Sequence, residues 1–185
     1  MIRKIVLASG SPRRKSLLEN YGFDITVVKP EFDEEAVTES EPEKLVCVLA
    51  SGKNKCVNMP DETVLSADTV VALDDEILGK PKTRGEAYDM LKKLSGRTHT
   101  VYTGVCISRN NKRTVAVSRS DVTFYELTDA QINRYIDTGS PFDKAGGYGV
   151  QDDMGIGFVK SVTGELSNVI GLPMGMVISQ LEDLK

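Results

Sequence analysis

The sequence has no tryptophan, one histidine and three cysteines, and each scarcity excludes a class of site. The histidine, His99, falls within a predicted strand, where we expect a packed residue. Ser-His-Asp catalysis, Cys-His catalysis and multi-histidine metal sites are therefore excluded. Cys47, Cys56 and Cys106 are odd in number and lack C-x-x-C spacing, which argues against a disulfide framework and a zinc knuckle. We expect three free, buried thiols in a reducing cytoplasm.

Long hydrophobic runs and an excess of positive charge are also missing. No apolar run reaches the roughly 18 to 20 residues that a membrane span requires, and the run at residues 5–8 is too short for a signal peptide. The 27 acidic residues outnumber the 23 Lys and Arg, whereas non-specific nucleic-acid binding needs a surplus of Lys and Arg. We expect a soluble, cytoplasmic protein with no membrane or nucleic-acid partner, in which a local cluster of cations meets any anionic ligand.

Strands and helices alternate along the chain, with no internal repeat or linker, so we expect one domain over residues 1–185. Hairpins interrupt the alternation. The predicted fold class is therefore α/β with a mixed, partly antiparallel twisted sheet and flanking helices. The apolar and turn patterns predict strands over residues 4–8, 24–28, 64–71, 98–108 and 114–127. They predict helices over residues 11–22, 42–57, 83–96, 128–139 and 171–184.

The first strand and helix, in LASGSPRRKSLLENYG (residues 7–22), bring three consecutive cations, residues 13–15, into one helical turn. Ser11 suits the N-cap, Pro12 the first helical position and Gly22 the C′ position. A helix N-terminus presents backbone N–H groups and the positive end of its dipole. An anion placed there would meet both the dipole and the side-chain charges.

Asp68 interrupts a strand that is otherwise interior in character. Alternation places its side chain on the face opposite to that of Thr69. A buried carboxylate is costly unless it is paired, hydrogen-bonded or bound to a metal. Two interpretations stay open: Asp68 carries chemistry, or it braces a neighbouring loop through backbone N–H groups.

Other charged residues lie where a phosphate or a metal could be approached, although each alone is more commonly a solvated surface charge. The acidic run of Asp33, Glu34 and Glu35 could ligate a hard cation such as Mg²⁺ or keep a loop solvated. Gln151, after a Gly-rich segment, can both donate and accept, as reading a nucleobase edge requires, or it can brace its loop. Cations near Gly or Pro at element ends are Arg13, Arg14, Lys53, Lys80 and Lys144.

No motif for covalent catalysis is present. An oxygen-ligated cation with a carboxylate base, acting on phosphate, is the most economical reaction class. Taken together and in order, six motifs closely resemble the Maf family of nucleoside triphosphate pyrophosphatases: LASGSPRR, SADTVV, LGKP, LKKLSGRTHTVYTGV, DKAGGYGVQ and VIGLP.

The resemblance covers nearly the whole chain and implies an activity and a fold. Family members hydrolyse a nucleoside triphosphate to the monophosphate and pyrophosphate with a divalent cation, Mg²⁺ or Mn²⁺. They are regarded as house-cleaning enzymes with a link to septum formation. The implied fold is an elongated, two-lobed α/β unit with a central cleft, similar to that of the inosine triphosphatases, and homodimers are usual.

The resemblance also implies roles for single residues. Asp68 matches the catalytic acid/base position. Ser9, Arg13 and Arg14 match the phosphate-binding loop, and Lys80 matches a second phosphate contact.

Further polar positions of the implied cleft match Glu34 and Lys53, and Glu34 joins Asp68 as an implied metal ligand. Arg13, Thr69 and Gln151 match the set of the branch that acts on dTTP and UTP, so pyrimidine triphosphates are the expected substrates.

Two positions depart from the family pattern. Lys53 is followed by Asn54 where Ala is common, which makes that helix face more polar. The usual Gly directly after Gln151 is absent, where the sequence reads DDMG, and the loop before Phe158 is one residue longer.

Three alternatives stay open. The chain could be a nucleotide-binding regulator of cell division without turnover. It could be the same enzyme acting on a purine or modified triphosphate. It could also bind single-stranded nucleic acid, for which an acidic chain with 6% aromatic residues is poorly suited.

Overall fold

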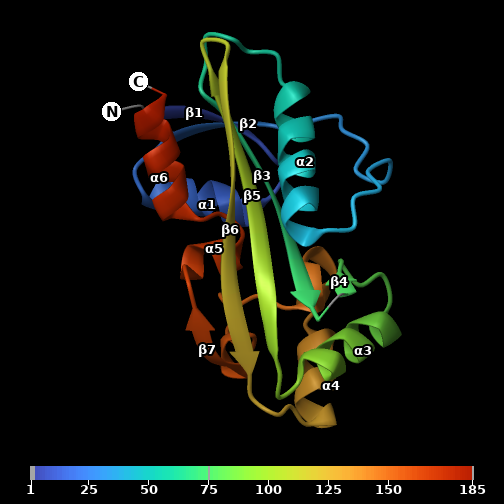
Figure 1. Cartoon of the computed structure of the whole chain (residues 1–185). Coiled ribbons are helices and arrows are strands. Elements are labelled where there is room, and N and C mark those ends of the chain that lie inside the picture. Colours follow the sequence, from blue (N-terminus) through green and yellow to red (C-terminus); the bar gives the residue numbers. More distant parts are fainter. Residues whose placement is uncertain (1–2, 75, 185) are drawn as a thin grey trace. The chain divides into compact units, whose positions relative to one another are not determined.

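The computed structural model describes residues 3–74 and 76–184 (Figure 1). The strands are β1 (Lys4–Ala8), β2 (Asp24–Val28), β3 (Val64–Leu73), β4 (Glu76–Leu78), β5 (Thr98–Arg109), β6 (Lys112–Phe124) and β7 (Val159–Thr163). The helices are α1 (Pro12–Asn20), α2 (Pro42–Lys55), α3 (Arg84–Leu94), α4 (Asp129–Asp137), α5 (Leu166–Ile170) and α6 (Met174–Asp183). No helix in these two ranges has the length and apolar character needed to cross a membrane.

The sheet is mixed, as the sequence predicts. Its strand order is β2-β1-β3-β5-β6-β7, with β4 paired to β3 outside this path. β1 pairs in parallel with β2 and β3, whereas β3–β4 and β6–β7 are antiparallel. The predicted fold class is therefore confirmed. Sequence patterns gave no sign of the short elements β7 and α5.

The described chain folds into two compact units. The first contains residues 3–69, 103–118 and 167–184, and the second contains residues 70–74, 76–102 and 119–166. Strands β3, β5 and β6 contribute residues to both units.

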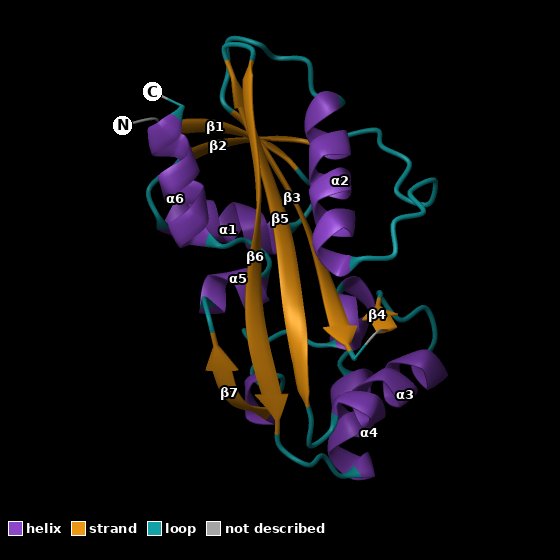
Figure 2. Ribbon diagram, viewed as in Figure 1, coloured by secondary structure: helices purple, strands orange, loops and turns teal. Residues whose placement is uncertain are grey.

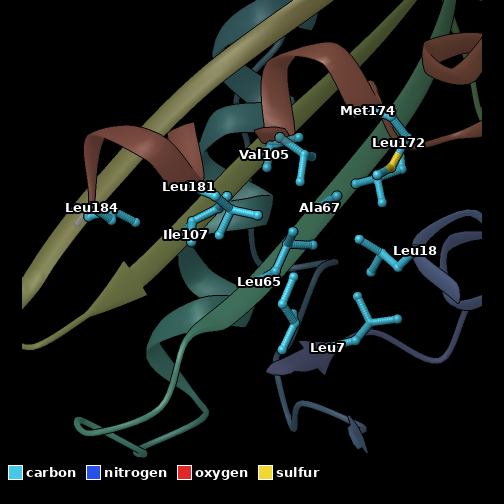
Figure 3. Close-up of a cluster of buried hydrophobic side chains, with 12 residues drawn as sticks. Leu7, Leu18, Leu65, Ala67, Val105, Ile107, Leu172, Met174, Leu181 and Leu184 are labelled. Atoms are coloured by element: carbon cyan, nitrogen blue, oxygen red, sulfur yellow. The ribbon is translucent and has the colours of Figure 1, made fainter. Parts of the chain in front are cut away.

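The first unit has a hydrophobic core on one face of its strands. Figure 3 shows Leu7 of β1, Leu65 and Ala67 of β3, and Val105 and Ile107 of β5 in one cluster. Their spacing by two residues places them on one face. Helix α1 and the C-terminal segment supply the other labelled side chains: Leu18, Leu172, Met174, Leu181 and Leu184.

Helix α2 covers the opposite face of these strands (Figure 2). Val6, Ala8 and Val64, which alternate with the core residues, form a separate small cluster there. A Cβ added at Gly104 of β5 would lie 2.3 Å from the carbonyl oxygen of Val46 in α2. The α2 backbone therefore lies directly against β5, at a distance that only glycine permits.

The predicted start of α1 is confirmed, whereas the helix predicted over residues 171–184 begins at Met174, after Pro173. Ser11 Oγ caps α1 by accepting from the Arg14 amide at 3.5 Å, and Pro12 occupies the first turn. Thr128 and Gln131 form the complete capping box of α4.

The second unit buries His99, which confirms it as a packed strand residue. The residue is 2% exposed, its ring meets the Phe124 ring edge-on at a centroid distance of 4.9 Å, and its Nε2 lies 2.7 Å from the Tyr148 hydroxyl. Burial lowers the pKa of His99 to about 4, and Asp121 opposes this shift. The ring is therefore neutral at pH 7.

All three thiols are free. Cys106 is buried as expected, but Cys47 is half-buried and Cys56 is exposed. The expectation of burial is wrong for these two, because Cys56 follows the last residue of α2 and Cys47 lies at the edge of the face that α2 buries.

The burial of neutral His99 makes the fold sensitive to acid. Its pKa falls from 6.5 to about 4 on folding, so its contribution is complete above pH 6.5 and is lost as the pH falls toward 4. We expect the free energy of unfolding to drop by about 2 kcal/mol between pH 7.5 and pH 5. Urea unfolding at both pH values measures this. His99→Gln should lose most of the difference, and an unchanged difference in that variant would contradict the assignment.

Candidate active site

Seven of the predicted site residues lie in the first unit. Ser9 follows β1, and Arg13 and Arg14 lie in the first turn of α1. Asp68 and Thr69 are consecutive in β3. The remaining two are Lys53 of α2 and Glu34 of the loop between β2 and α2.

The partner of Asp68 is Lys53. Asp68 is 9% exposed and Lys53 7% exposed, and Lys53 Nζ donates to Asp68 Oδ1 at 2.5 Å. The alternation of β3 turns Asp68 toward α2, whose last turn carries Lys53. The carboxylate is thus neutralised by a buried ammonium group rather than by the backbone N–H groups of a loop.

Glu34 approaches the same ammonium group from the acidic loop. Lys53 Nζ lies 3.0 Å from Glu34 Oε1, and the Glu34 side chain is half exposed. Asp33, by contrast, accepts from the amide of Glu35 at 3.1 Å within its own loop. Lys53 therefore bridges two carboxylates, and of the three acidic residues Glu34 is the one that reaches Lys53.

Phe32 holds this loop against α2. A Cβ added at Gly52 would lie 2.3 Å from the tip of the Phe32 ring. Gly52 immediately precedes Lys53, and Phe32 is two residues from Glu34. The ring therefore fixes the acidic loop beside the helical turn that carries the ammonium group.

Asn54, the residue after Lys53, is a buried cross-link. It is 1% exposed, and its Nδ2 donates to the carbonyl oxygens of Val64 at 3.1 Å and Cys106 at 3.3 Å. Arg113 Nε donates to Asn54 Oδ1 at 3.2 Å. The residue after Lys53 thus ties α2 to β3 and β5. Its polar side-chain atoms are satisfied by hydrogen bonds inside the fold.

Arg14 forms a second network on the opposite face of β3. Its Nε donates to the carbonyl oxygen of Gly171 at 2.9 Å, and its two terminal nitrogens donate to Ser9 Oγ at 3.1 Å and Thr69 Oγ1 at 3.2 Å. Thr69 Oγ1 also lies 2.9 Å from Thr103 Oγ1. Arg14 therefore joins α1, β3 and the turn before α6.

The charges of these two networks act on one another. Burial lowers the pKa of Arg14 below its usual value, Asp68 and Glu34 raise it, and Arg13 lowers it. The cluster thus contains the cations of Arg13, Arg14 and Lys53. Two carboxylates oppose these three cations, so the net charge of the cluster is positive and suits an anion.

The loop between β1 and α1 borders this cluster. Ser9 Oγ accepts from the amide of Ser11 at 3.2 Å, in addition to its bond from Arg14. Gly10 is exposed, and a Cβ there would meet no atom within 4 Å. Arg13 is partly exposed. The loop therefore combines an open backbone with a basic helix N-terminus, which is the arrangement that phosphate groups favour.

For a divalent cation, the first unit offers Asp68 and Glu34. Within residues 3–74 and 76–184, no cluster of three or more His, Cys, Asp or Glu side chains could hold a metal. Mg²⁺ is commonly held by one or two carboxylates together with substrate phosphates, so two oxygen donors fit such an ion.

Lys80 and Gln151 belong to the second unit, and both are exposed. Lys80 comes two residues after β4, and Gln151 lies in the turn after the Gly-rich segment. Lys144 is only 7% exposed, and its ammonium group contacts Ser140 and Asp143. Lys144 is therefore held within its own unit.

Sequence reasoning missed three contributors to the first unit's networks. Thr103 carried no signal. Gly171 belongs to the VIGLP motif but offers a carbonyl oxygen, which side-chain patterns do not reveal. The Phe32 contact depends on Gly52, and a glycine within a helical sequence gives no indication of which side chain packs against it.

The Phe32–Gly52 contact generates a prediction. Gly52→Ala places a methyl group where the ring lies, so the ring and the acidic loop should move away while α2 stays folded, because Ala favours a helix by about 0.5–1 kcal/mol over Gly. We expect several-fold faster amide hydrogen exchange over residues 29–41 and an unchanged melting temperature. Gly85→Ala in α3, where the nearest atom is 4.0 Å away, is the control. Unchanged exchange in Gly52→Ala would refute the proposed function of this contact.

Known proteins resemble this chain in sequence and in fold. It is 44% identical over 183 residues to proteins named dTTP/UTP pyrophosphatase from Bacillus anthracis and Bacillus cereus, covering 98% of this chain and 95% of each relative. A solved structure of the Staphylococcus aureus Ham1 protein matches 98% of this chain and 100% of that one with a TM-score of 0.54. Sequence identity to it is 13%, so this likeness concerns the fold alone, and it agrees with the predicted fold class.

A family model described as Maf-like protein matches residues 4–184. The matched range contains all six motifs that carried the resemblance. The chain therefore belongs to the Maf-like protein family.

Proposed function

We propose that this protein is a nucleoside triphosphate pyrophosphatase that hydrolyses dTTP and UTP to the monophosphate and pyrophosphate. The names of the relatives at 44% identity support this substrate class. The observation that carries the proposal is the pairing of buried Asp68 with Lys53 on the strand whose next residue, Thr69, accepts from Arg14 in the first turn of α1. A carboxylate and an anion-binding surface are thereby brought into one unit.

The positive charges at the start of α1 support a binding place for the triphosphate. Its phosphates lie at the loop of Ser9 and the first turn of α1, where Arg13 offsets their charge. Guanidinium groups suit this function because their planar forks can bind two phosphate oxygens at once. Arg14 is engaged with Ser9, Thr69 and the Gly171 carbonyl oxygen, so it also fixes the shape of this loop.

Asp68 acts on the water that attacks the α-phosphorus, either as the general base or as a metal ligand. The proposed cofactor is Mg²⁺ or Mn²⁺, held by Asp68 and Glu34. When bound, such an ion lowers the pKa of a water molecule and offsets charge on the phosphates. Lys53 holds the two carboxylates close together, which keeps the oxygen donors oriented before the ion binds.

The remaining assignments follow the family resemblance. Lys80 contacts phosphate, and Gln151, Arg13 and Thr69 select the base. The Thr69 hydroxyl contacts Arg14 and Thr103. These contacts support a role in which Thr69 positions the Arg14 side chain. We further propose a cytoplasmic homodimer that clears nucleotide pools and is linked to septum formation.

The activity is tested by product analysis. Purified protein with Mg²⁺ or Mn²⁺ is given dTTP, UTP, CTP, GTP, 7-methyl-GTP and ITP, and pyrophosphate and orthophosphate are measured separately. Pyrophosphate, fastest from dTTP or UTP, is expected. Faster turnover of a purine triphosphate would change the substrate, and no turnover with either metal would favour a nucleotide-binding regulator.

Asp68→Asn tests the catalytic carboxylate. We expect kcat to fall by a factor of roughly 10² to 10⁴, the range for an acid/base group, while nucleotide affinity is largely retained. Asp61→Asn, in the exposed turn before β3, is the matched control and should leave kcat unchanged. A near-normal kcat in Asp68→Asn would exclude Asp68 as the essential group.

A further inference from the structure

The turn that carries Gln151 is built on a buried polar cluster in the second unit. Residues 149–155 form this turn and contain the loop that is one residue longer than the family resemblance implies. Backbone hydrogen bonds link the residues before and after Gln151. Asp152 N–H donates to the Gly149 carbonyl oxygen at 3.1 Å, and Ile156 N–H donates to the Asp152 carbonyl oxygen at 3.0 Å. Asp152 is thus fixed in the main chain immediately after Gln151.

The Asp152 carboxylate is the centre of this cluster. Its Oδ2 accepts from the Tyr135 hydroxyl and from Ser140 Oγ, each at 2.6 Å. The Tyr135 hydroxyl in turn accepts from the Gly149 amide at 3.0 Å. A continuous chain of hydrogen bonds therefore joins the main chain before Gln151 to the side chain after it.

Lys144 lies between the carboxylates of Asp152 and Asp143. Its Nζ lies 3.4 Å from Asp152 Oδ2 and donates to the Ser140 carbonyl oxygen at 2.7 Å. Tyr135 is 1% exposed, and burial, then its bond to Asp152, raises the pKa of Tyr135 well above its usual range. The hydroxyl therefore stays protonated and donates to the carboxylate. Such clusters hold one geometry because an unpaired member would be costly.

The Gln151 side chain is exposed, and its amide lies directly over Gly149. A Cβ added at Gly149 would lie 2.9 Å from Gln151 Nε2, 2.8 Å from Asp152 Oδ2 and 2.6 Å from Lys144 Cε. A Cβ at Gly155 would lie 2.0 Å from the Gly149 carbonyl oxygen. The Gln151 side chain therefore folds back over Gly149, in space that exists only because that residue has no side chain.

We propose that Asp152, through Tyr135 and Gly149, is the positioning residue that fixes the Gln151 amide and so selects uracil and thymine over cytosine. This inference rests on the proposed function. Uracil and thymine present an N–H donor at N3 beside a carbonyl acceptor, whereas cytosine presents an acceptor at N3 beside an amino donor. An amide that can flip pairs with either pattern. An amide held in one orientation pairs with only one of them.

The test removes the cluster and measures both the turn and the base preference. The variants are Asp152→Ala and Tyr135→Phe; the second keeps the ring, which packs on Phe158 at 5.1 Å, and removes only the hydroxyl. Asp153→Ala, the exposed neighbour in the same turn, is the control. Amide exchange at Gly149, measured without nucleotide, should accelerate at least tenfold in both variants and stay unchanged in the control.

With nucleotide, the ratio of kcat/KM for UTP to kcat/KM for CTP should fall roughly tenfold in both variants, the value of about one hydrogen bond. Most of the change should come from faster CTP turnover. In a Gln151→Ala background, Asp152→Ala should have no further effect on the ratio. An unchanged ratio, or an equal loss for both nucleotides, would overturn the proposal and leave Asp152 a purely structural residue.

The two levels of the proposal fail separately. Protein that hydrolyses no triphosphate overturns the proposed function and the base selection with it. In that case unchanged exchange at Gly149 in Asp152→Ala would also overturn the positioning of the turn, whereas accelerated exchange would support it.

Discussion

The Lys53 ammonium group lies between two carboxylates, 2.5 Å from Asp68 Oδ1 and 3.0 Å from Glu34 Oε1, and much of the first unit is arranged to keep it there. A buried charge that loses its partner costs roughly 3–5 kcal/mol, so α2 must stay in register with β3. The Gly104 contact allows α2 to lie against β5, and Asn54 ties the turn that carries Lys53 to both strands. The ion pair is thus a structural requirement of the first unit as well as the proposed chemical centre.

The alternation of β3 divides the site between two faces of one strand. Asp68 faces α2 and the acidic loop, while Thr69 faces α1 and takes part in the Arg14 network. Arg14 reaches the Gly171 carbonyl oxygen, 157 residues away in sequence, and so fixes the first turn of α1 from the far end of the chain. One strand thereby couples the carboxylate to the loop between β1 and α1, because two consecutive residues anchor the two networks.

Local patterns predicted much of this arrangement. The start of α1, the helix over residues 128–139 and the opposite orientation of Asp68 and Thr69 follow from spacing and from residue chemistry within a few positions. The partner of Asp68 could not be predicted in this way, because Lys53 lies 15 residues away on another element and several other cations were equally plausible from the sequence. Phe32 on Gly52 and the carbonyl oxygen of Gly171 were unpredictable for a related reason: they depend on backbone proximity, which side-chain patterns do not encode. Lys144 was one of several cations that the sequence placed where a phosphate could be approached, and in the structure its ammonium group lies between Asp143 and Asp152.

The central claim is that water attacks the α-phosphorus of a pyrimidine nucleoside triphosphate at the Asp68 site. Hydrolysis of UTP in ¹⁸O-labelled water, followed by mass spectrometry of both products, tests this most directly. The account predicts one ¹⁸O atom in the monophosphate and none in the pyrophosphate. Label in pyrophosphate, or release of labelled orthophosphate with the diphosphate, would contradict it.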